Sequence, residues 1–405
     1  MSQMDSSSES GDSLQEKIID PFHAEKEEAI LKACKQRDLA KLRALAESQG
    51  GFLNDEIRQQ AWPVLLGLPP KCSYEDDSSS WQDLPPHKDE DQVQLDVDRA
   101  FTYYPDHETE SARTLQKSHL SSLILSVLRR HPYLHYFQGY HDICQVLLLV
   151  LPPSLRSPAL ARLSALRIRD FMLPNLQAAI AQLRLIPDIL RVSDPKLWRH
   201  LSGITEPFFA LSGTLTMYAH DITTLGEITR LFDVLLAREP VFSVYMFAAI
   251  VRSRREELFD TPEDEPEMLH SILSKLPKPL DLEGLIGDTV ALFEAYPPEK
   301  LPSWRWGISG CSVLKTARDE TGKGKGEVAS RQTMEDGKRF FERQVRELMW
   351  MERRQKARKW MWKNRRPVRT LGLAVLVGII AILLRRVPGG PMAWVMAVVN
   401  RWWLS

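Results

Sequence analysis

Apolar residues recur at helical spacing between about residues 24 and 300, and this periodicity constrains the fold more than any other feature of the chain. One clear example ends at two arginines, a histidine and Pro132, which is typical of a helix C-terminus. Its apolar stripe consists of Leu120, Leu123, Ile124, Val127 and Leu128. Strand-like alternation is scarce, and strands and helices do not alternate along the chain. The pattern therefore predicts an all-α fold.

Several helix starts can be placed from acids and prolines. Asp194 before Pro195 is typical of an N-cap followed by proline in the first helical turn. The segments 261–263 (Thr-Pro-Glu) and 281–283 (Asp-Leu-Glu) predict two further starts, with ends near Leu276 and Tyr296. The apolar runs 143–151 and 240–251 are too short to cross a bilayer, so we expect core helices there.

Composition excludes several classes of protein. The chain has 405 residues, 43% of them hydrophobic and 26% charged, which is ordinary for a globular protein. Its formal net charge of zero argues against a surface devoted to nucleic acid. The four cysteines, which are far apart and lack a histidine pattern, predict neither a zinc site nor disulfides. We expect no metal site and no nucleic-acid partner.

The neutral total is an average over unlike segments. Residues 75–91 carry seven acids and one base, within a stretch 70–92 that we interpret as an exposed acidic loop. Residues 341–369 carry eleven bases and three acids, so 341–367 reads as a basic juxtamembrane segment. The Ser-rich residues 1–23 predict a disordered N-terminus, and the polar composition of much of 301–340 predicts a linker. The main domain is then expected at 24–300.

An uncharged apolar run, 371–384, predicts a C-terminal membrane-anchor helix. Its fourteen residues rise only about 21 Å as a helix, against a hydrocarbon core of roughly 30 Å. Flanking residues extend the expected anchor to 368–388 if the neighbouring arginines reach the interface, leaving 389–405 as a short tail. Alternatively, residues 388–391 turn the chain and the Trp-rich 392–404 returns as an interfacial piece. A buried core helix is the competing interpretation.

The flanking bases predict the orientation of this anchor. Nine Lys or Arg residues lie between Arg353 and Arg369, whereas three follow Leu384. Positive flanks stay on the cytoplasmic side, so the N-terminal body is expected in the cytosol, on a tail-anchored protein that contacts lipid through its C-terminus.

Four motifs occur in a fixed order over about residues 50–300. They are Arg58-x-x-x-Trp62-x-x-Leu-Leu-Gly, Val93-x-x-Asp96-x-x-Arg99, Tyr136-x-Gln138-Gly139 and Arg230-x-Phe232-Asp233. This set resembles the TBC family of Rab GTPase-activating proteins, although Phe232 stands where that family has Trp. The resemblance implies a TBC-type helical domain, in which Arg99 and Gln138 are the arginine and glutamine fingers.

The remaining roles also follow from the resemblance. Asp96 is expected to hold the arginine finger by accepting hydrogen bonds, with Tyr136, Gly139 and Asp142 as further supporting residues. The fold-motif residues are expected to support packing rather than touch substrate, and they are Arg58, Trp62, Arg230 and Asp233.

The implied function is activation of GTP hydrolysis on a Rab in its GTP form. The Rab would hold GTP and Mg²⁺, and this chain would need no cofactor of its own. Closer similarity to a membrane-anchored branch of the family implies early secretory traffic between endoplasmic reticulum and Golgi. It also implies residence in the endoplasmic reticulum membrane or the cis-Golgi. A non-catalytic, membrane-anchored Rab-binding scaffold or tether is the alternative, and the Rab itself is not identified by the motifs.

Overall fold

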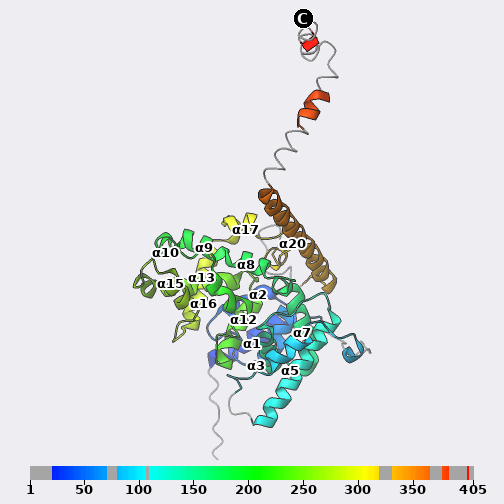
Figure 1. The fold of residues 1–405 in the computed structure, drawn as a ribbon. Coiled ribbons are helices and arrows are strands. Elements are labelled where there is room, and N and C mark those ends of the chain that lie inside the picture. The colour runs from blue at the N-terminus through cyan, green and yellow to red at the C-terminus, as the bar shows by residue number, and fades with distance from the viewer. Residues whose placement is uncertain are drawn as a thin grey trace, which may run out of the picture. The chain divides into compact units, whose positions relative to one another are not determined.

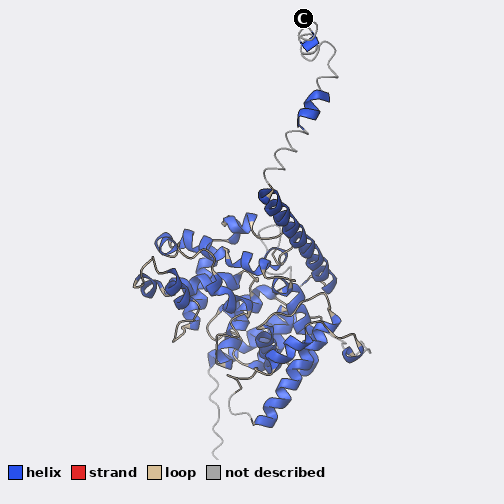
Figure 2. Ribbon diagram, viewed as in Figure 1, coloured by secondary structure: helices blue, strands red, loops and turns tan. Residues whose placement is uncertain are grey.

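The computed structural model describes residues 21–70, 80–105, 109–318, 331–364, 376–382 and 399–400. The chain divides into two compact units, Met1–Gln344 and Val345–Ser405. Every regular element among the described residues is helical, as Figure 2 shows. The predicted all-α class is therefore confirmed.

Short helices make up most of the first unit (Figure 1). In chain order they are α1 (Pro21–Gln36), α2 (Leu39–Glu47), α3 (Asp55–Leu65), α4 (Glu90–Val97), α5 (Glu110–Arg130), α6 (Tyr140–Val150), α7 (Pro153–Leu166), α8 (Gln177–Leu183), α9 (Leu185–Ser193), α10 (Pro195–His200), α11 (Leu211–Leu215), α12 (Leu225–Ala237), α13 (Phe242–Ser253), α14 (Arg255–Phe259), α15 (Pro266–Leu273), α16 (Leu282–Ala295), α17 (Pro302–Trp306) and α18 (Val313–Thr316). The 3₁₀ helices are η2 (Trp81–Asp83), η3 (Arg169–Met172), η4 (Phe208–Ala210) and η5 (Pro298–Lys300), and α20 (Met334–Lys363) runs on into the second unit.

Two almost fully buried helices form the centre of the core. α12 is buried from Ile228 to Ala237, and α13 is buried over nearly its whole length. α2 and α3 pack on α12, whereas α9 and α16 pack on α13. The runs 143–151 and 240–251 are core helices, as expected, because α6 and α13 bury them inside the unit.

A buried polar cluster joins α3 to α12. The Asp233 carboxylate accepts hydrogen bonds from the Arg58 guanidinium at 3.1 Å and from Trp62 Nε1 at 2.8 Å. It also accepts from the Phe52 backbone N–H at 3.0 Å. The ring of Phe232 packs 5.9 Å from that of Trp62. These contacts fix the N-terminal helices to the core.

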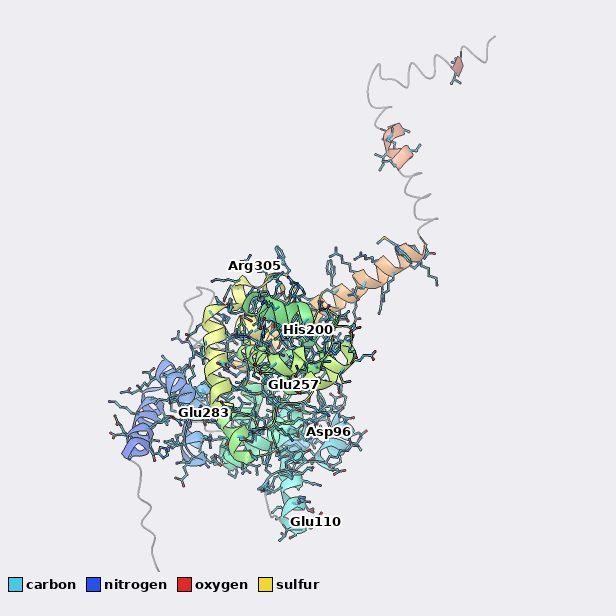
Figure 3. All side chains as sticks on the ribbon, turned by 90° about the vertical axis from the view of Figure 1, so that its left-hand side faces the viewer. Asp96, Glu110, His200, Glu257, Glu283 and Arg305 are labelled. Carbon is cyan, nitrogen blue, oxygen red and sulfur yellow. The ribbon has the colours of Figure 1, made fainter. Side chains whose placement is uncertain are left out.

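Arg230, one turn earlier on α12, makes a second joint. Its guanidinium donates to the carbonyls of Ala46 and Ser48 and, at 2.7 Å and 2.8 Å, to Glu283. Figure 3 shows Glu283 beside the N-terminal helices. Arg230 thereby ties α16 to the segment that follows α2.

Helix starts predicted from sequence are correct in two cases of three. Asp194 caps α10 and Asp281 caps α16, each accepting the backbone N–H three residues ahead. The start predicted at 261–263 is wrong, because α15 begins only at Pro266. Residues 261–265 form a turn closed by the Glu265 N–H on the Pro262 carbonyl. Proline restricts the residue before it to extended backbone, which delays the helix.

Two predicted segment boundaries need correction. Residues 301–318, expected to belong to a linker, form short helices whose Trp304, Val313 and Leu314 side chains are buried. α20 also begins within the expected linker, at Met334. The acidic stretch 70–92 contains η2 and the start of α4, so it is not all loop. Residues 1–20, 71–79 and 319–330 lie outside the described residues.

The described part of the second unit is helical at 345–363 and 376–382. Within the described ranges, no helix is both long and apolar enough to cross a bilayer. Most of the predicted anchor, 368–388, and of the tail, 389–405, lies outside those ranges.

Candidate functional site

Arg99 lies in the turn that ends α4, and its side chain is exposed. Its backbone N–H donates to the Asp96 carbonyl at 3.1 Å, which closes the turn. The Thr102 hydroxyl donates to the Arg99 carbonyl at 2.8 Å, and Lys117 Nζ on α5 donates to the neighbouring Asp98 carbonyl at 2.7 Å. The backbone that carries the guanidinium is thus held on both sides.

Gln145, on α6, fixes the loop that follows Arg99. Its side-chain oxygen accepts from the Phe101 N–H and its side-chain nitrogen donates to the Tyr104 carbonyl, both at 3.1 Å. Phe101 is buried with a φ of 60°, a left-handed conformation that costs a non-glycine residue energy. The buried amide compensates this cost by pairing the backbone groups that the bend exposes.

Gln138 belongs to the loop between α5 and α6. Its side chain is exposed, whereas its neighbours Phe137 and Gly139 are buried. Gly139 has a φ of 96°, and a Cβ atom there would lie 2.6 Å from Thr216 Cγ2. Only glycine fits that position, so the residue that turns the chain into α6 also sets the backbone direction at Gln138.

Tyr136 connects this loop to the helix that carries Arg99. Its hydroxyl donates to Asp96 Oδ2 at 2.8 Å, and its backbone N–H donates to Asp89 Oδ2 at 3.0 Å. Asp96, labelled in Figure 3, is only 2% exposed and accepts a further bond from Gln92 at 3.0 Å. Burial, together with the Asp96 charge, raises the pKa of the Tyr136 hydroxyl, which keeps it a donor. The carboxylate expected to brace Arg99 therefore joins the two finger segments to each other.

One hollow of about 260 Å³ is lined by both Arg99 and Gln138. The rest of its lining is Asp96, Ala100, Phe101, Thr102, Tyr103, Tyr104, His141, Asp142, Gln145, Ala219 and His220. A second hollow of about 550 Å³ lies against it, since the two share Gln138, His141, Asp142 and His220. Part of its lining is apolar and includes Phe171, Leu173, Leu211 and Leu215. The structure thus places the two predicted catalytic side chains on one concave surface.

Asp142 lies between the two hollows and contacts two histidines. Its Oδ2 lies 3.0 Å from His220 Nδ1, and its Oδ1 lies 3.2 Å from His141 Nε2. The hydrogen bond to Asp142 raises the pKa of His220, which favours the imidazolium. The imidazolium form of His220 offsets part of the Asp142 carboxylate charge beside the two hollows.

The fold-motif residues take no part in lining either hollow. Arg58, Trp62, Arg230 and Asp233 lie in the buried clusters that join α3 and α12 to their neighbours. Among the described residues, no group of His, Cys, Asp or Glu is arranged to hold a metal ion.

Sequence reasoning missed four residues that position the site. Asp89 lies in the stretch that the sequence predicts to be an exposed acidic loop. Gln145 is the single polar residue early in an apolar run, and this pattern indicates a buried amide that has hydrogen-bond partners. Thr216 and His220 come from a segment far along the chain, and nothing local marks them as neighbours of Gln138.

Comparisons with known proteins identify the family of the chain. The sequence model of the Rab-GTPase-TBC domain matches residues 55–259, which contain the Arg99 and Gln138 segments. GTPase-activating protein gyp10 of Schizosaccharomyces pombe is 34% identical over 285 residues, covering 70% of this chain and 76% of that protein. TBC1 domain family member 20 is 37% identical in Mus musculus over 269 residues and 35% identical in Homo sapiens. The chain spans 65% of the length of each of these two mammalian proteins.

Among solved structures, the Ypt/Rab-GAP domain of Gyp1p superposes with a TM-score of 0.49 at 16% sequence identity, covering 66% of this chain and 99% of that chain. The family assignment rests on the sequence matches, which include more than half of the chain and three quarters of the fission-yeast protein. The chain belongs to the Rab-GTPase-TBC domain family.

Proposed function

We propose that the chain accelerates GTP hydrolysis by a Rab-family GTPase, supplying an arginine and a glutamine in trans. The observation that carries the proposal is that Arg99 and Gln138, from two separate segments, line the same hollow. Family membership and the fission-yeast relative, named as a GTPase-activating protein, support it.

Arg99 is suited to stabilising charge that develops between the β- and γ-phosphates. Its planar guanidinium donates several hydrogen bonds in fixed directions, which a lysine ammonium does not. An arginine finger contributes about 10³–10⁵ in rate, so roughly 4–7 kcal/mol of the barrier depends on Arg99.

Gln138 is suited to orienting the attacking water, because an amide donates and accepts at once. It would take the place of the Rab's own glutamine. The brace of Asp89, Asp96 and Tyr136 holds its loop against α4, so both fingers approach the nucleotide as one preorganised surface. The partner in its GTP form would bring GTP and Mg²⁺, and this chain would add no cofactor.

We further propose that the C-terminal tail anchors the protein in the endoplasmic reticulum or cis-Golgi membrane, with the first unit in the cytosol. The uncharged run 371–384 and the excess of bases before it support the anchor and its orientation. A role in early secretory traffic belongs to the same proposal, and it rests on the resemblance of the sequence motifs to the membrane-anchored branch of the family.

A panel of GTP-loaded Rabs tests the activity and separates it from the scaffold alternative. For each Rab, single-turnover hydrolysis and binding of the GTP form are measured side by side. We expect at least one Rab of early secretory traffic to hydrolyse its bound GTP about 10³-fold faster or more in the presence of this chain than alone. Tight binding of GTP-form Rab without any acceleration would show a scaffold instead.

A further inference from the structure

The described helix at the start of the second unit, residues 345–363, combines exposed aromatic side chains with a concentration of bases. It carries seven Lys or Arg residues and two acids, and five of the bases fall within 353–359 without an acid. Trp350 and Trp360 are each 60% exposed, and Met349 and Met361 are 49% and 48% exposed. Large apolar side chains exposed together usually mark an interaction surface.

These side chains form a stripe on one side of the helix. At about 100° per residue, four of the six exposed apolar residues and four bases fall within an arc roughly 160° wide, whereas Met351 and Trp362, 41% and 75% exposed, lie outside it. This interfacial stripe consists of Arg346, Met349, Trp350, Arg353, Arg354, Lys356, Trp360 and Met361. The two acids of the segment, Glu347 and Glu352, lie outside it. The Arg354 guanidinium packs over the Trp350 ring, 5.3 Å from its centre, so bases and rings share one surface.

A stripe of this composition matches the boundary region of an anionic bilayer. Tryptophan and methionine can enter the acyl region just below the headgroups, while arginine and lysine stay at the level of the phosphates. The bases are concentrated where acidic lipids would attract them. Self-association is disfavoured, because a second copy would bring the same excess of positive charge to the same surface.

We propose that the interfacial stripe binds an anionic membrane surface, with the helix lying in the plane of the bilayer, separately from any insertion of the run 371–384. From Arg346 to Met361 the helix would extend about 22 Å along the surface. The inference does not depend on the proposed activity toward Rabs.

A fluorescent label tests the stripe in the full-length chain. Met361→Cys places an environment-sensitive fluorophore on the stripe, and Lys359→Cys places it on the opposite side of the helix. Each labelled chain is reconstituted into vesicles of phosphatidylcholine alone or with one third phosphatidylserine, and the labelled unsubstituted chain gives the background from native cysteines. The tail is present in every sample, so it contributes equally to all comparisons.

With phosphatidylserine, we expect the emission maximum of the label at position 361 to shift to shorter wavelength. We also expect its fluorescence to be quenched by brominated acyl chains. High ionic strength should reverse both effects, because it screens the bases. The label at position 359 should change little. The inference is overturned if position 361 responds equally in both lipid mixtures, or if positions 359 and 361 respond alike. A response that follows protein concentration rather than lipid composition would also overturn it, by showing self-association.

Two variants with the same loss of charge provide a matched control for the label at position 361. Arg353→Gln/Arg354→Gln/Lys356→Gln removes three bases from the stripe. Arg358→Gln/Lys359→Gln/Lys363→Gln removes three bases from the rest of the helix. We expect the fluorescence response to phosphatidylserine to fall severalfold in the first variant and only slightly in the second. Equal losses would show that net charge, and not the stripe, attracts the membrane.

Discussion

At the scale of single residues, the site depends on side chains that hold the two fingers rather than on the fingers alone. Arg99 and Gln138 are exposed, whereas the groups behind them are buried and hydrogen-bonded. Tyr136 is held at both its hydroxyl and its backbone by carboxylates of the α4 segment. Such a brace reduces the conformational entropy that the fingers would lose on engaging a nucleotide.

Gly139 gives the sharpest test of this positioning. Gly139→Ala should lower the rate at which this chain stimulates GTP hydrolysis on a Rab at least about tenfold, because its methyl group collides with Thr216 and its φ of 96° is unfavourable for alanine. Gly287→Ala, in α16, is the control, since a Cβ there meets nothing within 4 Å. It should keep the full rate and leave stability unchanged or higher by up to about 1 kcal/mol. A Gly139→Ala protein with the wild-type rate would refute the positioning role.

His220 makes a prediction about pH. Because Asp142 raises the pKa of His220 in the folded chain, the pair stabilises the fold fully below the ordinary histidine value of about 6.5. This contribution is lost as pH rises through the raised, folded-state pKa. The side chain of His220 is 60% exposed, so solvent limits the effect to about 1 kcal/mol or less.

The free energy of unfolding of wild type and His220→Gln, measured across this pH range, checks the prediction. The free energies of unfolding of the two proteins should differ most at mildly acidic pH and become equal in alkaline solution. In an Asp142→Asn background, the pH-dependent effect of the same substitution should be much smaller, because the largest cause of the raised His220 pKa is gone. A difference that stays constant with pH would count against the ion pair.

At the scale of helices, the joint between α3 and α12 carries more of the stability than its few residues suggest. Asp233→Ala would leave the Arg58 charge and the Trp62 N–H buried without their shared acceptor. We expect a loss of about 3–5 kcal/mol in the free energy of unfolding, measured by denaturant titration. Glu283→Gln, at the partly exposed end of the neighbouring Arg230 joint, should cost about 1 kcal/mol or less. Similar losses for the two variants would contradict a buried joint.

The helices themselves could be predicted from sequence where local signals decide. The stripe from Leu120 to Leu128 and the caps at Asp194 and Asp281 depend on neighbours within one or two turns, and those predictions are correct. The start at 261–263 was misplaced because two prolines competed for it, and the structure uses Pro266. The linker prediction for 301–318 is wrong because these residues lie next to the polar stretch 312–340 and form no long apolar stripe, although several of their side chains reach the core.

The site shows the same division between local and distant information. Motif resemblance located Arg99 and Gln138, which the structure brings to one hollow. It did not predict that Asp96 would bind Tyr136, or that Thr216 would cover Gly139, because these contacts join segments far apart in sequence. Periodicity and composition carry no information about such pairs.

At the scale of the whole molecule, the zero net charge separates into an acidic stretch before the arginine finger and a basic stretch before the apolar tail. Deleting 368–405 should release the protein from membranes while leaving GTPase activation in solution intact. Sedimentation with membranes should be measured at high ionic strength, where surface binding by bases is screened. Deleting only 389–405 distinguishes the two tail arrangements, since a single span should keep this variant on the membrane. Full sedimentation of the longer deletion at high salt would contradict the anchor.

The central claim is that Arg99 and Gln138 act together on the nucleotide of a Rab. Single-turnover hydrolysis by a responsive GTP-loaded Rab, with wild type, Arg99→Ala, Gln138→Ala and the off-site control Arg113→Ala, tests it most directly. The account predicts that both finger variants lose about 10³-fold or more of the stimulation, while Arg113→Ala keeps it and all four proteins retain their helical content. Equal stimulation by wild type and either finger variant would contradict it.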